Sequence, residues 1–148
     1  MLREIRGVAQ RHPSLLRRWF QDDYFDLIVW HDATGEIARF QLSYARETPA
    51  ERLLEWQRSR GFQHLKTDAQ APKAGRDDAW ALRLDGAFPY DALAGRFAAA
   101  AAHLPAELRR FVAERMHEFA HPPRKFRRKD ARRPRWLERL RARSRGVS

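Results

Sequence analysis

Two runs rich in apolar and β-branched residues, 23–31 and 36–44, flank the short polar segment "DATG". The first run has apolar residues on both faces, which is typical of a central strand that is covered on both sides. Gly35 suits the left-handed position of a type I turn with a G1 bulge, and the Asp32 carboxylate can bond the turn's own backbone. We therefore predict a β-hairpin over residues 23–44.

The register of this hairpin depends on where the turn closes. If Asp32 closes the turn, Ile28 faces Phe40 across the two strands. If His31 closes it, Leu27 faces Phe40 instead. A slip of one residue moves every side chain to the other face of the sheet, and the pattern leaves both registers open.

Three further segments extend the predicted sheet. Residues 51–57 and 62–67 are predicted as a second hairpin around "RSRG", although 51–57 also suits a short helix that begins after "TP". Residues 68–78 contain Pro, Gly and charge without a period and are predicted as a loop. Residues 79–84 alternate between apolar and other side chains, which predicts a half-buried strand.

Apolar residues recur at helical spacing over 88–104 and again over 105–120. Pro89 and Pro105 suit the first turn of each helix, and "PP" at 122–123 ends the second. The predicted inward-facing stripes consist of Leu93, Phe97, Ala100 or Ala101 and Leu104 in the first helix, and of Leu108, Phe111, Val112, Met116 and Phe119 in the second.

Residues 2–11 and 14–20 are predicted as short helical pieces separated at "HP", because the residue before a proline avoids the helical conformation. Strands followed by two helices indicate an α+β fold. We predict a single domain over 1–120, with an antiparallel sheet of about four to five strands, two C-terminal helices on one face and a short N-terminal helix. Residues 121–148 form a basic tail, disordered or partly helical.

The charge of the chain is concentrated in this tail. The full chain carries a net charge of +11, and residues 121–148 hold twelve basic and two acidic side chains, a net charge of +10. The first 120 residues are therefore nearly neutral. A basic charge confined to one end indicates an appended arm for polyanions rather than a basic face of the fold.

The tail is the first functional candidate, because Arg forms bidentate contacts with phosphate and Trp can stack on bases. Residues 134–144 could form about two turns of basic helix, which is too short to be stable alone. There are competing interpretations: the tail could bind a protein partner, the domain itself or an anionic membrane, or it could serve only to keep the protein soluble. The candidate nucleic-acid-binding residues are Arg124, Lys125, Arg127, Arg128, Lys129, Arg132, Arg133, Arg135, Trp136, Arg139, Arg141 and Arg143.

The second candidate is the segment "HEFAH" at 117–121, which fits the pattern H-E-x-x-H and resembles the zincin metallopeptidases over five residues. That resemblance implies a zinc hydrolase in which His117 and His121 bind the metal and Glu118 acts as general base. His121 precedes a proline, however, and the acid downstream that could complete the site, Glu138, lies among arginines. We favour two surface histidines near a helix end, without metal.

Other polar residues have structural interpretations. His31-Asp32 is predicted to stabilise the turn, and no nucleophile is identified nearby. The acidic residues Asp22, Asp23 and Asp26 lack calcium-loop spacing and are expected to pair with arginines. Trp56 and His64 could flank a pocket on the sheet, but aromatic residues at strand positions usually belong to the core. No phosphate-binding glycine motif or G-x-S-x-G is present.

The composition of the chain narrows the remaining functional classes and the expected cellular location. The chain has no cysteine, which excludes disulfides and thiolate chemistry. No segment has the length and hydropathy of a membrane span or a secretory signal, and the Arg-rich usage is typical of a GC-rich bacterial genome. We therefore expect a cytoplasmic binding protein, without catalytic residues, metal or cofactor, that binds nucleic acid or another polyanion. A protein-interaction module that forms a homo-oligomer through its apolar sheet face is a further alternative.

Overall fold

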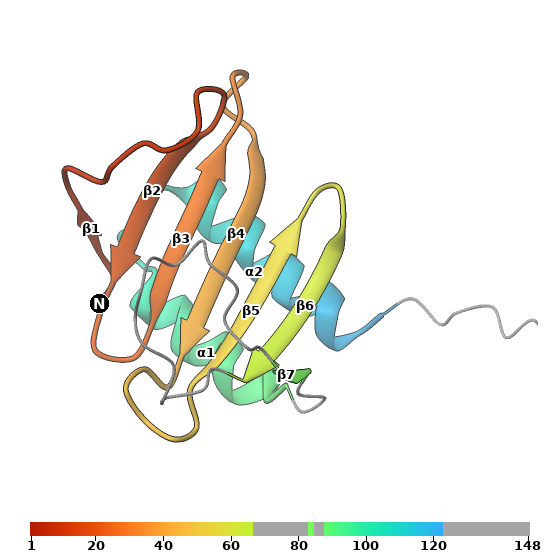
Figure 1. The fold of residues 1–148 in the computed structure, drawn as a ribbon. Helices are drawn as coiled ribbons and strands as arrows, with labels where there is room; N and C mark the ends of the chain where they lie inside the picture. The colour runs from red at the N-terminus through yellow and green to blue at the C-terminus, as the bar shows by residue number, and fades with distance from the viewer. Residues whose placement is uncertain (67–82, 85–87, 123–148) are drawn as a thin grey trace, which may run out of the picture.

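The computed structural model describes residues 1–66, 83–84 and 88–122. These residues form an α+β fold with an antiparallel sheet and two helices, as the sequence predicted (Figure 1). Each strand pairs with the next one along the chain, so the sheet is a meander in the order β1 to β7. Its strands are β1 (Arg3–Ile5), β2 (Leu16–Gln21), β3 (Asp26–His31), β4 (Ile37–Tyr44), β5 (Arg52–Gln57), β6 (Gly61–Lys66) and β7 (Arg83–Leu84).

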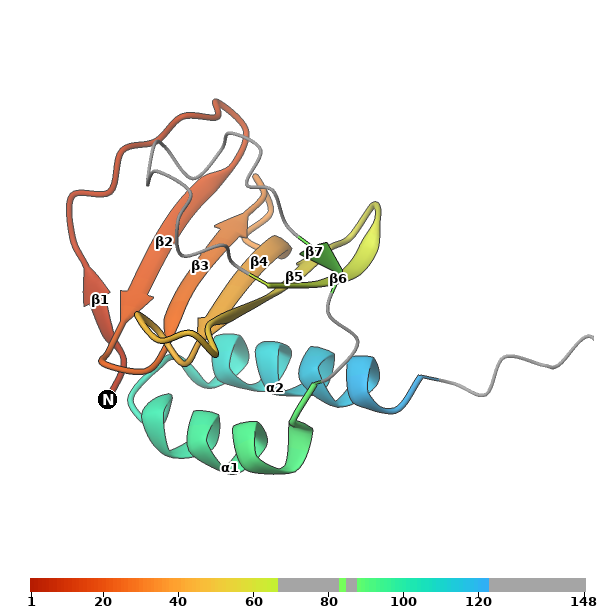
Figure 2. The same ribbon diagram turned by 60° about the horizontal axis from the view of Figure 1, so that its bottom comes forward.

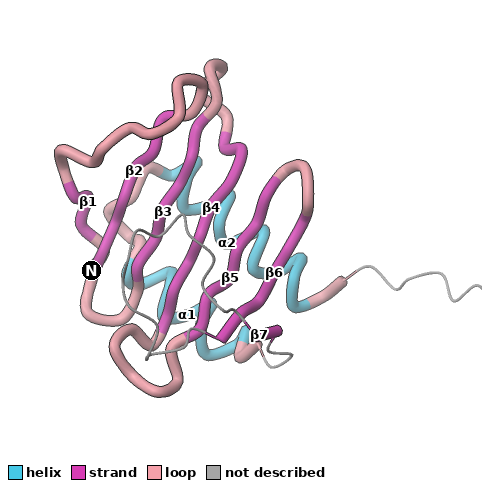
Figure 3. Tube along the Cα trace, viewed as in Figure 1, coloured by secondary structure: helices cyan, strands magenta, loops and turns pink. Residues whose placement is uncertain are grey.

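The two helices, α1 (Tyr90–Ala100) and α2 (Ala106–Ala120), lie side by side on one face of the sheet (Figures 2 and 3). Both begin directly after a proline, Pro89 or Pro105, and neither has a side-chain cap. Each has one acidic residue in its first turn, Asp91 in α1 and Glu107 in α2, which complements the positive end of the helix dipole. The predicted helices are confirmed. Helix α1 is a few residues shorter than predicted at both ends, whereas α2 begins one residue late and ends at Ala120, as predicted.

The core lies between the sheet and the helices. Inward side chains alternate along the central strands, as expected for a sheet with one face on a core, and the helices contribute the predicted stripes. Aromatic rings join the layers: Phe111 of α2 packs edge-on against Phe40 and Trp56, with centroids 6.4 and 5.1 Å away. The fully buried large residues include Phe20, Phe25, Phe40, Phe97, Leu27, Leu42, Leu54, Leu93 and Met116.

The prediction of a short N-terminal helix is wrong, and so is the count of four to five strands. Residues 3–5 and 16–21 are the strands β1 and β2, which extend the sheet beyond β3. Strand β3 is buried along most of its length and needs a neighbour on each side. Since β2 has only six residues, its local pattern cannot distinguish a helix from a strand, and pairing with β3 decides its structure.

Both predicted hairpins are present. In the first, Asp32 closes the turn against Glu36, as one of the two expected registers has it, but the pairing farther along the strands differs from both expectations. Val29 lies opposite Phe40, whereas His31 lies opposite Ile37, so the register shifts within the hairpin. Residue Ala38 is the extra residue of a β-bulge in β4. The bulge places Val29 rather than Leu27 or Ile28 opposite Phe40. The apolar residues Leu27 and Val29 of β3 and Phe40 and Leu42 of β4 therefore all face the core.

The second hairpin is β5–β6, which excludes the helical alternative for 51–57. Of the strand predicted at 79–84, only the last two residues are described, as β7, and they pair with β6. The loop predicted at 68–78 and the tail beyond residue 122 lie outside the described residues. Within the described residues, neither helix has the length and hydropathy needed to span a bilayer.

Candidate functional site

The twelve tail residues proposed to bind nucleic acid lie outside the described residues. The structure does show how the helix before them ends. Helix α2 ends at Ala120, and His121 leaves the helical conformation with φ −125° and ψ 66°, as expected for a residue before proline. Phe119 packs on Phe62 of β6 with ring centroids 5.4 Å apart, so the end of α2 lies beside the last long strand (Figure 2).

The two histidines of "HEFAH" lie together on the exposed side of this helix end. Their rings stack with centroids 4.3 Å apart, and Tyr90 meets both rings edge-on. The His121 Nδ1 lies 3.1 Å from the His117 carbonyl oxygen, where it donates if it carries the proton. Glu118 forms an ion pair with Arg115 at 3.1 Å.

This arrangement lacks a third ligand within the described residues. No group of three or more His, Cys, Asp or Glu residues suited to a metal ion occurs among them. Glu138, the acid that the sequence offered, lies outside that range. The described geometry is that of a small aromatic cluster formed by Tyr90, His117 and His121.

Asp22 and Asp26 have structural roles, but the Asp22 carboxylate does not form the expected pair with an arginine of the described residues. The Asp22 carboxylate accepts hydrogen bonds from the backbone N–H groups of Tyr24 and Phe25, at 2.8 and 2.6 Å. It also pairs with the N-terminal ammonium group at 3.3 Å. Burial raises the pKa of Asp22, but these hydrogen bonds and the ammonium charge outweigh it and lower the pKa below the usual value. Asp26 is buried and accepts a hydrogen bond from the Trp19 indole.

Asp32 holds the β3–β4 turn, as the sequence predicted. Its Oδ1 accepts hydrogen bonds from the Thr34 hydroxyl, the Thr34 N–H and the Glu36 N–H, and its Oδ2 pairs with Arg58 at 3.0 Å. The Thr34 hydroxyl and Arg58 stabilise the ionised carboxylate and lower the pKa of Asp32 to about 2. Gly35 has φ of 84°, the left-handed conformation that the turn requires.

His64 and Trp56 point into the core rather than flank an open pocket on the sheet. The His64 side chain is 3% exposed, and its Nε2 lies 2.7 Å from the Tyr44 hydroxyl. Phe88 and Phe119 pack against the His64 ring, with centroids 5.4 and 5.8 Å away. This buried polar pair was not predicted, because Tyr44 and His64 are 20 residues apart and meet only through the order of the strands.

A second polar group missed by the sequence lies on the sheet face that points away from the helices. Glu55 of β5 pairs with Arg39 of β4 at 3.3 Å and accepts hydrogen bonds from Gln41 and Gln57. The Arg39 guanidinium also lies over the Trp30 ring, 4.5 Å from its centroid. The alternation of polar and apolar residues along β4 and β5 could have indicated that Arg39, Gln41 and Glu55 share a face. That inference requires the register between the two strands, which the sequence does not give.

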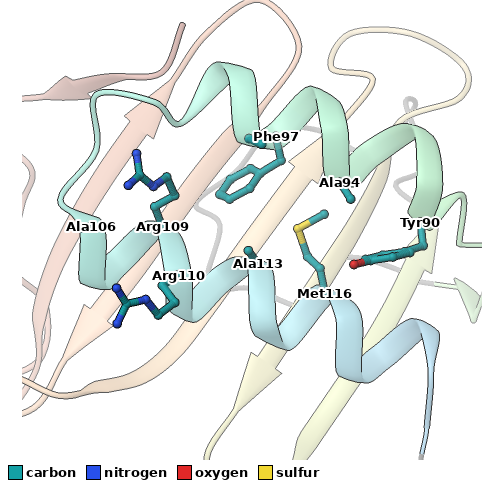
Figure 4. Close-up of a pocket in the computed structure, with 9 residues that line it drawn as sticks. Tyr90, Ala94, Phe97, Ala106, Arg109, Arg110, Ala113 and Met116 are labelled. Atoms are coloured by element: carbon teal, nitrogen blue, oxygen red, sulfur yellow. The ribbon is translucent and has the colours of Figure 1, made fainter.

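A further feature that the sequence did not predict is a groove between the two helices (Figure 4). Its apolar lining comes mostly from small side chains of both helices, and two arginines of α2 line the part beside Ala106. We call it the interhelical groove and define it by Tyr90, Ala94, Phe97, Ala98, Ala106, Arg109, Arg110, Ala113 and Met116.

Comparison with family models, with curated proteins and with solved structures finds no match for this chain. The functional conclusions below therefore depend on the residues of this chain alone.

Proposed function

We propose that this protein is a non-enzymatic binding protein whose Arg-rich arm, residues 121–148, binds nucleic acid. The observation that carries the proposal is the distribution of charge. Twelve basic and two acidic residues share the last 28 positions, whereas the first 120 residues are close to neutral. Such an arm would neutralise phosphates and release their counterions, which gives affinity with little dependence on sequence.

Ion pairs within the folded part support this assignment. Five of its arginines lie against carboxylates, which compensates their charge locally. The pairs are Arg18–Glu4 at 2.8 Å, Arg39–Glu55 at 3.3 Å, Arg46–Glu47 at 3.1 Å, Arg58–Asp32 at 3.0 Å and Arg115–Glu118 at 3.1 Å. In the arm, two acidic residues cannot neutralise twelve basic ones, so the excess charge remains for a polyanionic partner.

The side-chain chemistry of the arm favours nucleic acid over a simple polyanion. Ten of its twelve basic residues are arginines, whose planar guanidinium groups bond phosphate oxygens in pairs and stack on bases. Phe126 and Trp136 add rings on which unpaired bases can stack. Single-stranded RNA or DNA is therefore the preferred ligand class.

The test is a comparison of two double variants that remove the same charge. Arg132→Gln with Arg133→Gln removes two charges from the arm. Arg3→Gln with Arg60→Gln removes two from exposed positions of the sheet region and is the matched control. Fluorescence anisotropy with a labelled single-stranded RNA should show clearly weaker binding for the arm variant and nearly unchanged binding for the control.

Equal losses in the two variants would mean that total charge, not the arm, determines binding. Unchanged binding in both would show that the arm does not contact RNA. Either result would reject the proposal.

A further inference from the structure

The interhelical groove has the size and composition of a small-ligand site. Its volume is about 350 Å³, within the range of roughly 300–1,000 Å³ that is typical of such sites. Phe97 and Met116, each 1% exposed, form its floor. The alanines of both helices form its sides, as Figure 4 shows. Because alanine side chains are short, the two helices leave open space on the side that faces away from the sheet.

The polar groups of the groove lie at its two ends. Arg109 and Arg110 lie near Ala106, and the Tyr90 ring lies at the opposite end beside Met116 (Figure 4). Arg109 Nη1 donates a hydrogen bond to the Ala102 carbonyl at 3.1 Å, which holds this side chain beside the loop between the helices. Arg110 is exposed and forms no ion pair with any of the described residues.

Among the described residues, no carboxylate lines the groove to balance these two charges. Glu107 and Glu114 belong to the same helix, but neither is among the lining residues, and Glu114 lies 3.7 Å from Arg115. An apolar groove with positive charge at one end complements a ligand with an apolar body and an anionic head. The same positive charge disfavours the Arg-rich arm of this chain as the occupant.

We propose that the interhelical groove binds a medium-chain alkyl carboxylate. The carboxylate would lie against Arg110 and Arg109, and the alkyl chain would extend over Phe97 and Met116 toward Tyr90. From Arg110 to Met116 the helix rises about 9 Å, at about 1.5 Å per residue, which suits a chain of medium length. The site is separate from the proposed nucleic-acid arm and involves none of its residues.

The probe for the test is octanoate, titrated into the full-length protein and followed by calorimetry and by NMR of labelled alanine methyl groups. Because the basic arm would also attract anions, all titrations would contain saturating heparin. We expect saturable binding that shifts the methyl signals of Ala94, Ala98 and Ala113. Saturation without any shift at these three positions would overturn the proposal.

A double variant separates binding in the groove from binding by the charge of the arm. Ala98→Leu combined with Ala113→Leu fills the groove without changing any charge, and both positions are exposed and helical, so the fold should persist. Octanoate binding should be lost in this double variant. Circular dichroism would confirm that the helices are intact, and undiminished binding with intact helices would contradict the proposal.

Arg110→Gln tests the head-group contact, with Arg60→Gln in the β5–β6 turn as the matched control. Loss of one charge-assisted hydrogen bond should weaken octanoate binding about tenfold in the first variant and leave it unchanged in the second. Equal weakening in both would reject the assignment of Arg110.

Two ligands with the same alkyl chain test the choice of head group. The neutral 1-octanol should bind more weakly than octanoate, and octyl phosphate should not exceed it. Tighter binding of octyl phosphate would contradict the choice of a carboxylate and indicate that the groove binds a phosphate ester. If 1-octanol binds as tightly as octanoate, the arginines do not contribute to binding of the head group.

Discussion

Asp32 connects the β3–β4 turn to the β5–β6 turn, because it caps the first of these and pairs with Arg58, which follows β5. Its lowered pKa, about 2 against the usual 3.8, means that the ionised form is stabilised by folding. The resulting stability is fully present above pH 3.8 and is lost as the pH falls through about 2.

Substitution Asp32→Asn should therefore lower the melting temperature at neutral pH, because it removes the charge that Thr34 and Arg58 stabilise. The difference between wild type and variant should narrow as the pH falls from 3.8 toward 2. Thermal unfolding of both proteins at several pH values measures this. A difference that stays constant over the range would show that Asp32 acts only through turn geometry.

The buried pair Tyr44–His64 is the polar interaction of the core that sequence analysis missed. Tyr44→Phe removes the hydroxyl 2.7 Å from His64 Nε2 and should lower the free energy of unfolding by about 1 kcal/mol. Tyr90→Phe is the control, since the Tyr90 hydroxyl makes no hydrogen bond within the described residues. Urea unfolding compares the two, and equal effects would show that the Tyr44–His64 bond adds no stability.

His117 allows a test of the zinc-hydrolase alternative. Within the described residues it stacks on His121 and meets Tyr90 edge-on, without a third metal ligand. We expect His117→Ala to leave the metal content of the purified protein unchanged and to change stability by less than about 0.5 kcal/mol, as for other exposed positions. Stoichiometric zinc in the wild type that is absent from the variant would favour the hydrolase instead.

At the scale of elements, helix α1 is attached to the sheet chiefly through Leu93 and Phe97, each 1% exposed. The Phe97 ring packs edge-on against Phe25, with centroids 5.8 Å apart. Phe97 also forms part of the groove floor, so the packing of α1 and the shape of the groove depend on the same side chain.

Substitution Phe97→Ala should lower the free energy of unfolding by about 3–5 kcal/mol, because it leaves a cavity under α1. Leu16→Ala in β2 is the control. Because Leu16 is 55% exposed, this substitution should lower the free energy of unfolding by less than about 0.5 kcal/mol. Urea denaturation of both variants measures the difference. A small effect for Phe97→Ala would mean that α1 repacks, or that it contributes little to the fold.

The elements that could be predicted are those with strong local signals. The turn around Asp32 and Gly35 and the apolar stripes of both helices indicate their structure without help from the rest of the chain. Strand β2 could not be predicted, because its six residues take their conformation from pairing with β3. The bulge at Ala38 was equally unpredictable, since it adds a residue without changing the turn.

At the scale of the whole molecule, the two candidate sites differ in how much the sequence reveals. The charge of the arm is a property of composition and needs no structure. The interhelical groove requires the relative placement of α1 and α2, and its residues have no distinctive motif. Arg110 looks like any solvated helix arginine until the structure places it beside an apolar hollow.

The combined picture is a nearly neutral α+β fold in the first 120 residues, followed by residues 121–148, which carry almost all of the net charge. The central claim is that this arm binds nucleic acid through its phosphates. If it does, affinity should fall steeply with salt, because each neutralised phosphate releases counterions. The slope of log K against log salt then reports how many phosphates are neutralised.

The most direct measurement is a salt series of anisotropy titrations with single-stranded RNA, on the full-length protein and on a chain that ends at Pro122. We predict a slope of about −4 or steeper for the full-length protein, from six or more phosphates at roughly −0.7 each, and no measurable binding for the shortened chain. Binding of the shortened chain with the same affinity and slope would contradict the account.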